Sequence, residues 1–157
     1  MVFLTNMDND IKFMKLALKE AKKAEEIDEV PIGCVIVKDN KVISRGFNHR
    51  ETRKLAISHA EIEAINKANK KLDAWRLEDC DIYITLEPCL MCAGAIIQAR
   101  FKRVIFGAKD FKGGAFGSSI NVLDAKNINH HPEIVSGVLE EECSSIITNY
   151  FRNKRSK

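Results

Sequence analysis

The chain has 157 residues, of which 45% are hydrophobic and 30% are charged. This length and composition are typical of one soluble globular domain with a sizeable core, and they exclude a disordered or fibrous chain. The formal net charge of +3 permits a polyanionic partner but does not require one, because dedicated nucleic-acid-binding domains are usually more basic. We therefore expect residues 1–157 to form a single domain.

The first predicted element is an amphipathic helix, whose apolar positions recur at helical spacing: Ile11, Met14, Leu18 and Ala21. Asp8 or Asp10 is placed to cap it. Its other face carries lysines that we expect to be solvated rather than bound to RNA: Lys12, Lys15, Lys19, Lys22 and Lys23. Residues 32–37 and 42–47 are rich in β-branched residues and flank a short polar turn, so they are predicted to form a hairpin.

The rest of the chain alternates predicted helices and strands. A helix over about 59–71 is followed by an apolar strand over 82–86 and by a helix that Pro88 opens and that reaches about Arg100. A strand over 104–106 then leads into a glycine-rich loop over 107–119. The last two elements are a strand near 134–135 and a helix over about 139–153. This order predicts an α/β fold, a three-layer α/β/α sandwich built on a five-stranded mixed sheet.

The five cysteines indicate metal chemistry rather than disulfides. Their number is odd, and no secretory signal or long apolar segment accompanies them. In a reducing compartment, closely spaced cysteines are more often metal ligands or nucleophiles than disulfide partners. We therefore expect a cytoplasmic protein with no membrane segment. Three of the cysteines have no close ligand partner in the sequence and are expected to be small core residues: Cys34, Cys80 and Cys143.

Cys89 and Cys92 are the candidate ligands, because they lie three residues apart in the predicted first turn of a helix and can point the same way. Unpaired N–H groups and the positive end of the helix dipole favour the thiolate form that binds metal. His59, at the start of the preceding helix, supplies an imidazole. Two thiolates and one imidazole leave a fourth position open for water, which is typical of catalytic zinc.

Glu61 follows His59 in the first turn of the same helix, where its carboxylate can reach the same cleft. A carboxylate beside a zinc-activated water can take its proton and pass it to a ring nitrogen and to departing ammonia. The pattern of His-Ala-Glu followed by Pro-Cys-x-x-Cys therefore predicts hydrolytic deamination. The alternative is a closed structural zinc site, in which Glu61 would have no role and the fourth ligand would be one of Cys80, His49, His130 and His131.

Two further segments are candidates for substrate contact. The glycine-rich loop lacks the Gly-Lys-Ser/Thr of a phosphate loop, so we expect an irregular rim carrying Lys109, Asp110 and Lys112. Asp110 can contact a ribose 2′-hydroxyl or simply cap its own turn. Residues 150–157 mix two aromatic with four basic residues, a composition that suits single-stranded RNA, unless this is a solvated, frayed helix end.

Over nearly its whole length the chain resembles the bacterial tRNA-specific adenosine deaminases, within the cytidine and deoxycytidylate deaminase superfamily. The matching segments are 29–33, Asn48, 59–61, 75–77, 85–96, 104–110, 117–118, 129–130 and 150–152. The resemblance implies a cytidine deaminase-like fold. One departure is that members often carry a proline shortly before the His-Ala-Glu, where this chain has residues 55–58 without one.

The resemblance also implies roles for residues and partners. One Zn²⁺ per subunit would be held by His59, Cys89 and Cys92, and Glu61 would shuttle protons. The implied enzyme is a homodimer that acts on the wobble position of a tRNA anticodon stem-loop. Expected substrate contacts are Asn48 (to the flipped nucleotide), Asp110, Lys112, Phe151 and Arg152. Two alternatives remain open: a deaminase of a free base or nucleotide, such as guanine or cytosine, and a non-catalytic, zinc-stabilised RNA-binding module.

Overall fold

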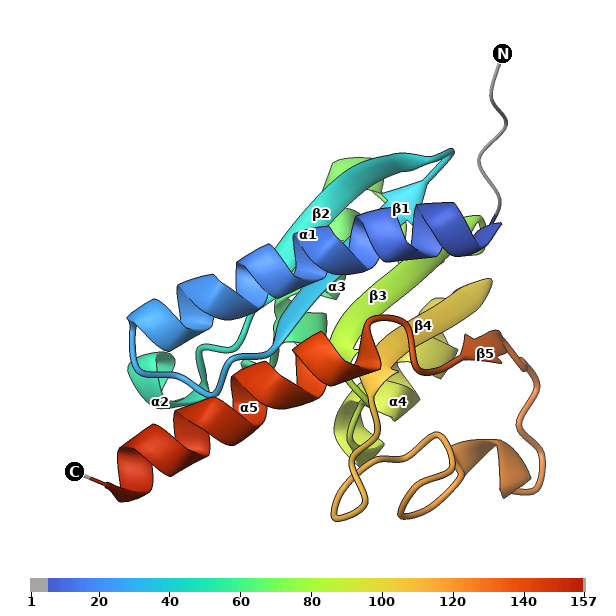
Figure 1. The fold of residues 1–157 in the computed structure, drawn as a ribbon. Coiled ribbons are helices and arrows are strands. Elements are labelled where there is room, and N and C mark those ends of the chain that lie inside the picture. Colours follow the sequence, from blue (N-terminus) through green and yellow to red (C-terminus); the bar gives the residue numbers. More distant parts are fainter. Residues whose placement is uncertain (1–5, 157) are drawn as a thin grey trace.

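The protein is described here by a computed structural model, which covers residues 6–156. Its centre is one five-stranded sheet in the order β2-β1-β3-β4-β5 (Figure 1). The strands are β1 (Gly33–Lys38), β2 (Lys41–Phe47), β3 (Cys80–Leu86), β4 (Arg103–Ala108) and β5 (Glu133–Val135). β1 runs antiparallel to β2 and β3, whereas β3, β4 and β5 are parallel. The predicted mixed sheet and its hairpin are thus confirmed.

Helices cover both faces of this sheet. α1 (Asn6–Glu26) and α5 (Glu140–Arg155) lie on one face, and α3 (Ala60–Leu72) and α4 (Leu90–Ala99) lie on the other (Figure 1). The short helices α2 (Arg50–Arg53) and η1 (Val122–Asp124) lie in the connections. This arrangement confirms the three-layer α/β/α sandwich. None of the described helices is long and apolar enough to cross a membrane.

Alternation along the strands divides the core in two. On β1, Cys34 and Ile36 pack toward α3 and α4, whereas Val35 and Val37 pack toward α1. A strand sends successive side chains to opposite faces, so a central strand covered on both sides must be apolar throughout. This explains why β1 and β3 are nearly continuous hydrophobic runs.

Two glycines let helices approach the sheet closely. A Cβ at Gly33 would lie 2.0 Å from the Ala17 carbonyl oxygen of α1, and one at Gly46 would lie 2.4 Å from the Ala60 carbonyl oxygen of α3. Both neighbours are backbone, which cannot rotate away. Gly46 therefore fixes the distance between β2 and the first turn of α3.

The buried face of α1 differs from the predicted one. Ile11 and Leu18 are only half-buried, and the buried positions are Asp10, Phe13, Met14, Ala17, Glu20, Ala21 and Ala24. Asp10 is not a cap, because α1 begins at Asn6 and the Asp10 carboxylate accepts hydrogen bonds from the Tyr83 hydroxyl at 2.6 Å and from Arg103 at 2.8 Å. The five lysines of the opposite face are exposed, as predicted.

Candidate active site

The predicted metal ligands lie at the N-termini of two helices on the same face of the sheet. His59 is the N-cap residue of α3, and Cys89 is the N-cap residue of α4, one position before the predicted first turn. Cys92 lies inside that first turn and is buried. The chain reaches Cys89 directly from the carboxyl end of β3, the edge of the sheet where open α/β folds place their sites.

The three donor atoms converge. His59 Nδ1 lies 3.6 Å from Cys89 Sγ and 3.6 Å from Cys92 Sγ, and all three atoms lie within 4.8 Å of one another. Usual Zn–N and Zn–S lengths of about 2.05 and 2.3 Å at tetrahedral angles require a nitrogen–sulfur distance of about 3.6 Å. The residues present therefore fit a tetrahedral cation with three protein ligands.

A fourth protein ligand does not join them within the described part of the chain. Two of the candidates for a closed site are engaged elsewhere, since His49 Nδ1 lies 2.8 Å from the Phe47 carbonyl oxygen and His130 Nε2 lies 2.6 Å from that of Phe101, and His131 is exposed. Burial raises the pKa of the Cys80 thiol to about 11 and keeps it protonated. The geometry favours an open, three-ligand site over the structural alternative.

The remaining cysteines behave as core residues. Cys34 and Cys143 are completely buried, like Cys80. Burial raises the pKa of Cys34 well above its usual value and that of Cys143 to about 12. By contrast, hydrogen bonds from Cys92 and His59 lower the pKa of Cys89 to about 3. Cys89, at the helix N-cap, is thus favoured as a thiolate, the form that binds metal.

Glu61 lies beside these ligands, as expected from the sequence. It is 4% exposed and lies in the first turn of α3. Burial raises the pKa of Glu61 to about 7. A buried carboxylate two residues from a ligand imidazole can accept or donate a proton without itself being needed as a ligand.

A pocket of about 590 Å³ opens next to His59, a size that suits a nucleotide-sized ligand. Four of the five predicted substrate residues line it: Asn48, Asp110, Lys112 and Phe151. Arg152 is exposed and is not among the described residues that line the pocket. Sequence reasoning missed several lining residues with a polar or aromatic head, among them Arg50 and the 75% exposed Phe111.

Asn48 directly follows β2 and is held in a fixed orientation. It is 5% exposed, its backbone N–H donates to the Ile32 carbonyl at 3.2 Å, and its Nδ2 donates to the Val30 carbonyl at 3.4 Å. Its Oδ1 accepts the Arg50 backbone N–H at 3.1 Å. The amide therefore presents one defined face to the pocket.

The rim of the pocket is organised by a residue that sequence reasoning did not assign a role. Glu87 is 2% exposed, and its carboxylate accepts the backbone N–H groups of Asp110 at 3.1 Å, Phe116 at 3.0 Å and Ser118 at 3.2 Å. In the sequence, the only sign of this role is that Glu87 lies between an apolar strand and a proline. Gly114 is needed beside it, because a Cβ there would lie 2.4 Å from the Glu87 carboxyl carbon.

Asp110 has the turn-capping role that the sequence analysis gave as the alternative to a contact with a ribose hydroxyl. Its Oδ1 accepts the backbone N–H groups of Lys112 at 3.1 Å and Gly113 at 3.2 Å, so it caps its own turn. A contact between Asp110 and a ribose hydroxyl stays a prediction. Lys112 is exposed on the same turn.

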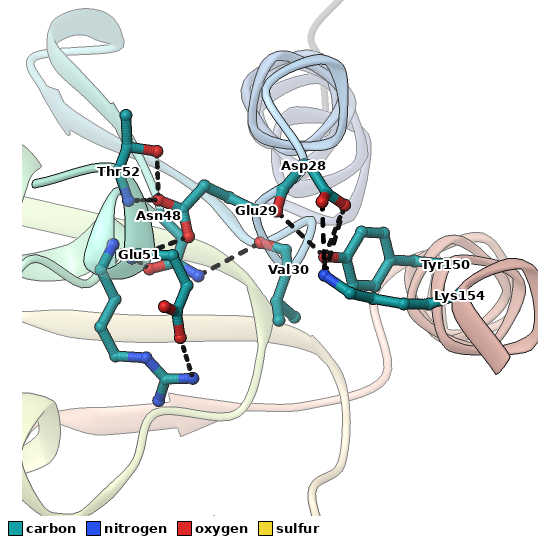
Figure 2. Close-up of polar contacts among 9 residues, drawn as sticks. Asp28, Glu29, Val30, Asn48, Glu51, Thr52, Tyr150 and Lys154 are labelled. Atoms are coloured by element: carbon teal, nitrogen blue, oxygen red, sulfur yellow. Dashed lines mark hydrogen bonds and ion pairs between the residues drawn. The ribbon is translucent and has the colours of Figure 1, made fainter. Parts of the chain in front are cut away.

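The C-terminal segment is helical rather than frayed, since α5 extends to Arg155. Tyr150 is 8% exposed, and its hydroxyl contacts the carbonyl and carboxylate oxygens of Asp28, each at 3.1 Å (Figure 2). Phe151 is 41% exposed at the pocket. Tyr150 therefore fixes the helix, whereas the ring of Phe151 is free to face a ligand. Lys157, the last basic residue of the predicted tail, lies outside the described residues.

Comparison with known proteins agrees with this geometry. A family model of MafB19-like deaminases matches residues 7–155. The chain is 51% identical to a tRNA-specific adenosine deaminase of Bacillus subtilis, over 96% of this chain and 94% of the relative. It is 43% identical to one from Streptococcus pyogenes, over 97% of this chain and 89% of the relative.

A solved structure extends the likeness to three dimensions. It comes from a study of A-to-I editing by tRNA:A34 deaminases at the wobble position of transfer RNA, and it aligns with a TM-score of 0.83 at 45% identity. The alignment covers 86% of this chain and 98% of the other. The fold is thus deaminase-like. With this family model matched over residues 7–155 and relatives of this kind, the chain belongs to the MafB19-like deaminases and to the tRNA-specific adenosine deaminase family.

Proposed function

We propose that this protein is a zinc-dependent hydrolytic deaminase that converts adenosine to inosine at the wobble position of tRNA. The observation that carries the proposal is the convergence of His59, Cys89 and Cys92, with the buried Glu61 nearby, beside a nucleotide-sized pocket that His59 itself lines. The names of the relatives support the substrate. On this proposal residues 1–157 act as a single deaminase domain.

The proposed cofactor is one Zn²⁺ per subunit, held by the His59 imidazole and the two thiolates. When bound, zinc supplies Lewis-acid activation of the hydrolytic water. Two thiolates and a neutral imidazole balance its charge. The donor spacing described above supports this choice, because it matches the Zn–N and Zn–S lengths.

Glu61 is the proposed proton carrier. Water adds to C6 of the adenine ring while the Glu61 carboxylate takes one of its protons and delivers it to N1. A second proton then passes through Glu61 to the exocyclic nitrogen, the C6–N bond breaks and ammonia leaves, which gives inosine. Burial of the carboxylate keeps bulk water from diverting these protons.

The pocket mouth suits an RNA loop rather than a free base. Phe111 and Phe151 expose aromatic rings on which flanking bases can stack, and Arg50, Lys109 and Lys112 place positive charge around them. Asn48 is proposed to hydrogen-bond the flipped nucleotide. Arg152, one residue beyond Phe151, is proposed to contact the RNA outside the pocket.

We also propose a homodimer that works in the cytoplasm. The outer face of α4 supports a subunit contact, because Leu90 is 61% exposed and the side of Gly94 that would carry a Cβ is open. Leu55 and Ile57, in the loop before His59, are exposed apolar residues as well. Five free cysteines are consistent with a reducing compartment.

The experiment that tests the function offers the purified protein an anticodon stem-loop with adenosine at the wobble position, alongside free adenosine, adenine, guanine and cytosine. Inosine is measured in the RNA and ammonia in every reaction, with light scattering for the oligomeric state. We expect turnover of the stem-loop alone. Deamination of a free base but not of the RNA would replace this proposal with the free-base alternative, and zinc with no deamination at all would favour the RNA-binding module.

A further inference from the structure

Segment 28–30, between α1 and β1, connects the two sides of the substrate pocket. On one side Asp28 contacts α5 through Tyr150 and Lys154; on the other, Val30 accepts the side-chain hydrogen bond of Asn48 (Figure 2). Between them lies Glu29, which is 1% exposed. Its backbone N–H donates to the Ala24 carbonyl at 2.9 Å, which ties it to the end of α1.

The Glu29 carboxylate points to the N-terminus of α2. It accepts the backbone N–H groups of Glu51 at 3.1 Å and Thr52 at 2.6 Å, and also the Thr52 hydroxyl (Figure 2). The N-cap residue of α2, His49, makes no side-chain cap hydrogen bond. Asn48 accepts the first N–H of α2, that of Arg50, and Glu29, 22 residues before Glu51 in sequence, supplies acceptors for the next two.

A four-residue helix cannot stand without such support, because isolated short helices are unstable in water. In turn, α2 supports the wall of the pocket that Asn48 and Arg50 line. Its first residue, Arg50, donates its backbone N–H to Asn48 Oδ1 at 3.1 Å. The residue before it, His49, donates its backbone N–H to the Ser58 carbonyl at 2.9 Å, next to the ligand His59.

The geometry points to Glu29 as a positioning residue that sets the Asn48 amide against the substrate base by capping α2. The argument rests on the proposed function insofar as Asn48 contacts the flipped nucleotide. Hydrogen bonds from Thr52 and Glu51 outweigh the effect of burial and lower the pKa of Glu29, which keeps it a carboxylate able to accept three donors.

The decisive variant is Glu29→Gln. It preserves volume, but one of the two accepting oxygens becomes an NH₂ group that faces a backbone N–H, so at least one hydrogen bond of the cap is lost and a buried donor is left without an acceptor. Because a small misplacement at the reacting base is costly, kcat on the stem-loop should fall on the order of tenfold to a hundredfold, with KM little changed. The matched control is Glu20→Gln, an equally buried glutamate of α1 that pairs with Lys23 and Arg45, and it should leave kcat and KM unchanged.

A double-mutant cycle with Asn48→Ala separates positioning from general structure. If Glu29 acts through Asn48, adding Glu29→Gln to Asn48→Ala should cost no further activity, whereas a merely structural role would give additive losses. Zinc content and melting temperature are measured in all four proteins. Should Glu29→Gln fold poorly, Thr52→Val removes one donor at an exposed position and should give a smaller loss with the same non-additivity.

A second readout needs no turnover. In the NMR spectrum the Asn48 side-chain amide, identified by its disappearance in Asn48→Ala, should shift or broaden in Glu29→Gln and stay in place in Glu20→Gln. An unshifted Asn48 signal or an additive cycle would overturn the inference. Failure of the wild-type protein to deaminate the stem-loop would instead count against the proposed function, and the Asn48 signal would still decide the role of Glu29.

Discussion

At the scale of single residues, the sharpest consequence concerns Glu61. It lies beside the three donors without being one of them, so Glu61→Ala should retain zinc while losing turnover. General acid–base groups contribute on the order of 10² to 10⁴ in rate, and we expect a loss of this size. Metal analysis and inosine formation are measured on the same preparation. A metal-loaded variant with near-normal activity would refute the assignment.

The ligand set gives a second residue-scale prediction. Cys89→Ser or Cys92→Ser should lower zinc content and activity together, because an alcohol at either position is a far poorer ligand than a thiolate. Cys34→Ser is the control, since Cys34 is a buried core residue outside the donor group. Metal is quantified per folded protein. Zinc lost from the Cys34 variant would show that the ligand set is wrong.

Residue patterns predicted the chemistry better than they predicted the partners of buried charges. Short-range helix geometry placed Cys89 and Cys92 together, and the combined pattern of His-Ala-Glu and Pro-Cys-x-x-Cys added His59, which is 30 residues from Cys89 in sequence. Asp10 is different: its partner Arg103 is 93 residues away in sequence, so no local pattern could show that this aspartate is buried. Glu87 is of the same kind, since its partners are backbone groups of a loop.

At the scale of elements, hydrophobic periodicity was sufficient for the five strands and the long helices. It could not reveal α2, whose four residues, Arg50–Arg53, have no apolar face and are none of them buried. It also misplaced the buried face of α1, where Phe13 and Ala17 pack inward while Ile11 and Leu18 stay half-buried. Tertiary contacts decide such cases, because the face that meets the sheet is chosen by the whole interface and not by the helix alone.

The close approach of α3 to β2 leads to an element-scale prediction. Gly46→Ala should push the Ala60 carbonyl, and with it the first turn of α3, away from the sheet. Overpacking of this kind costs about 1–3 kcal/mol of stability, which corresponds to a melting temperature lower by several degrees. Because His59 and Glu61 flank Ala60, activity should fall further than the loss of stability explains.

Gly33→Ala is the matched control for that prediction. It meets the α1 backbone in the same way, with a Cβ 2.0 Å from the Ala17 carbonyl oxygen, but it lies on the other face of the sheet from α3. Thermal melting and zinc affinity are compared for the two variants. Equal loss of zinc affinity in both would mean that α3 is not specifically displaced in Gly46→Ala.

At the scale of the whole molecule, charge is the quantity of interest, because the net charge of +3 is small for a protein proposed to bind tRNA. The placement of positive side chains near the pocket must therefore compensate for the small net charge. Arg152 and Arg155 lie in the last turns of α5, are exposed, and follow the pocket residue Phe151. Lys154 is a poor choice for substitution, because it donates to Asp28 and Tyr150 and so helps to hold α5.

Replacing Arg152 and Arg155 together by alanine should weaken binding of an anticodon stem-loop and flatten its salt dependence. Each lost phosphate contact lowers the slope of log Kobs against log salt by about 0.7–0.9. Affinity is titrated at several salt concentrations, with melting temperature as the check on folding. An unchanged slope would show that this end of α5 faces solvent and does not contact the RNA.

The donor spacing at the proposed metal site also bears on how the protein would gain and lose the proposed zinc. Both ligand-bearing helices are anchored by fully buried residues, Ala60 and Ala64 in α3 and Ala93 and Ile96 in α4. Small zinc domains collapse on chelation because their core is too small to hold the ligands together. Here a two-sided core holds them, so a chelator should yield an inactive but folded apoprotein with an unchanged circular dichroism spectrum. The same molecule could then be refilled by added metal without refolding.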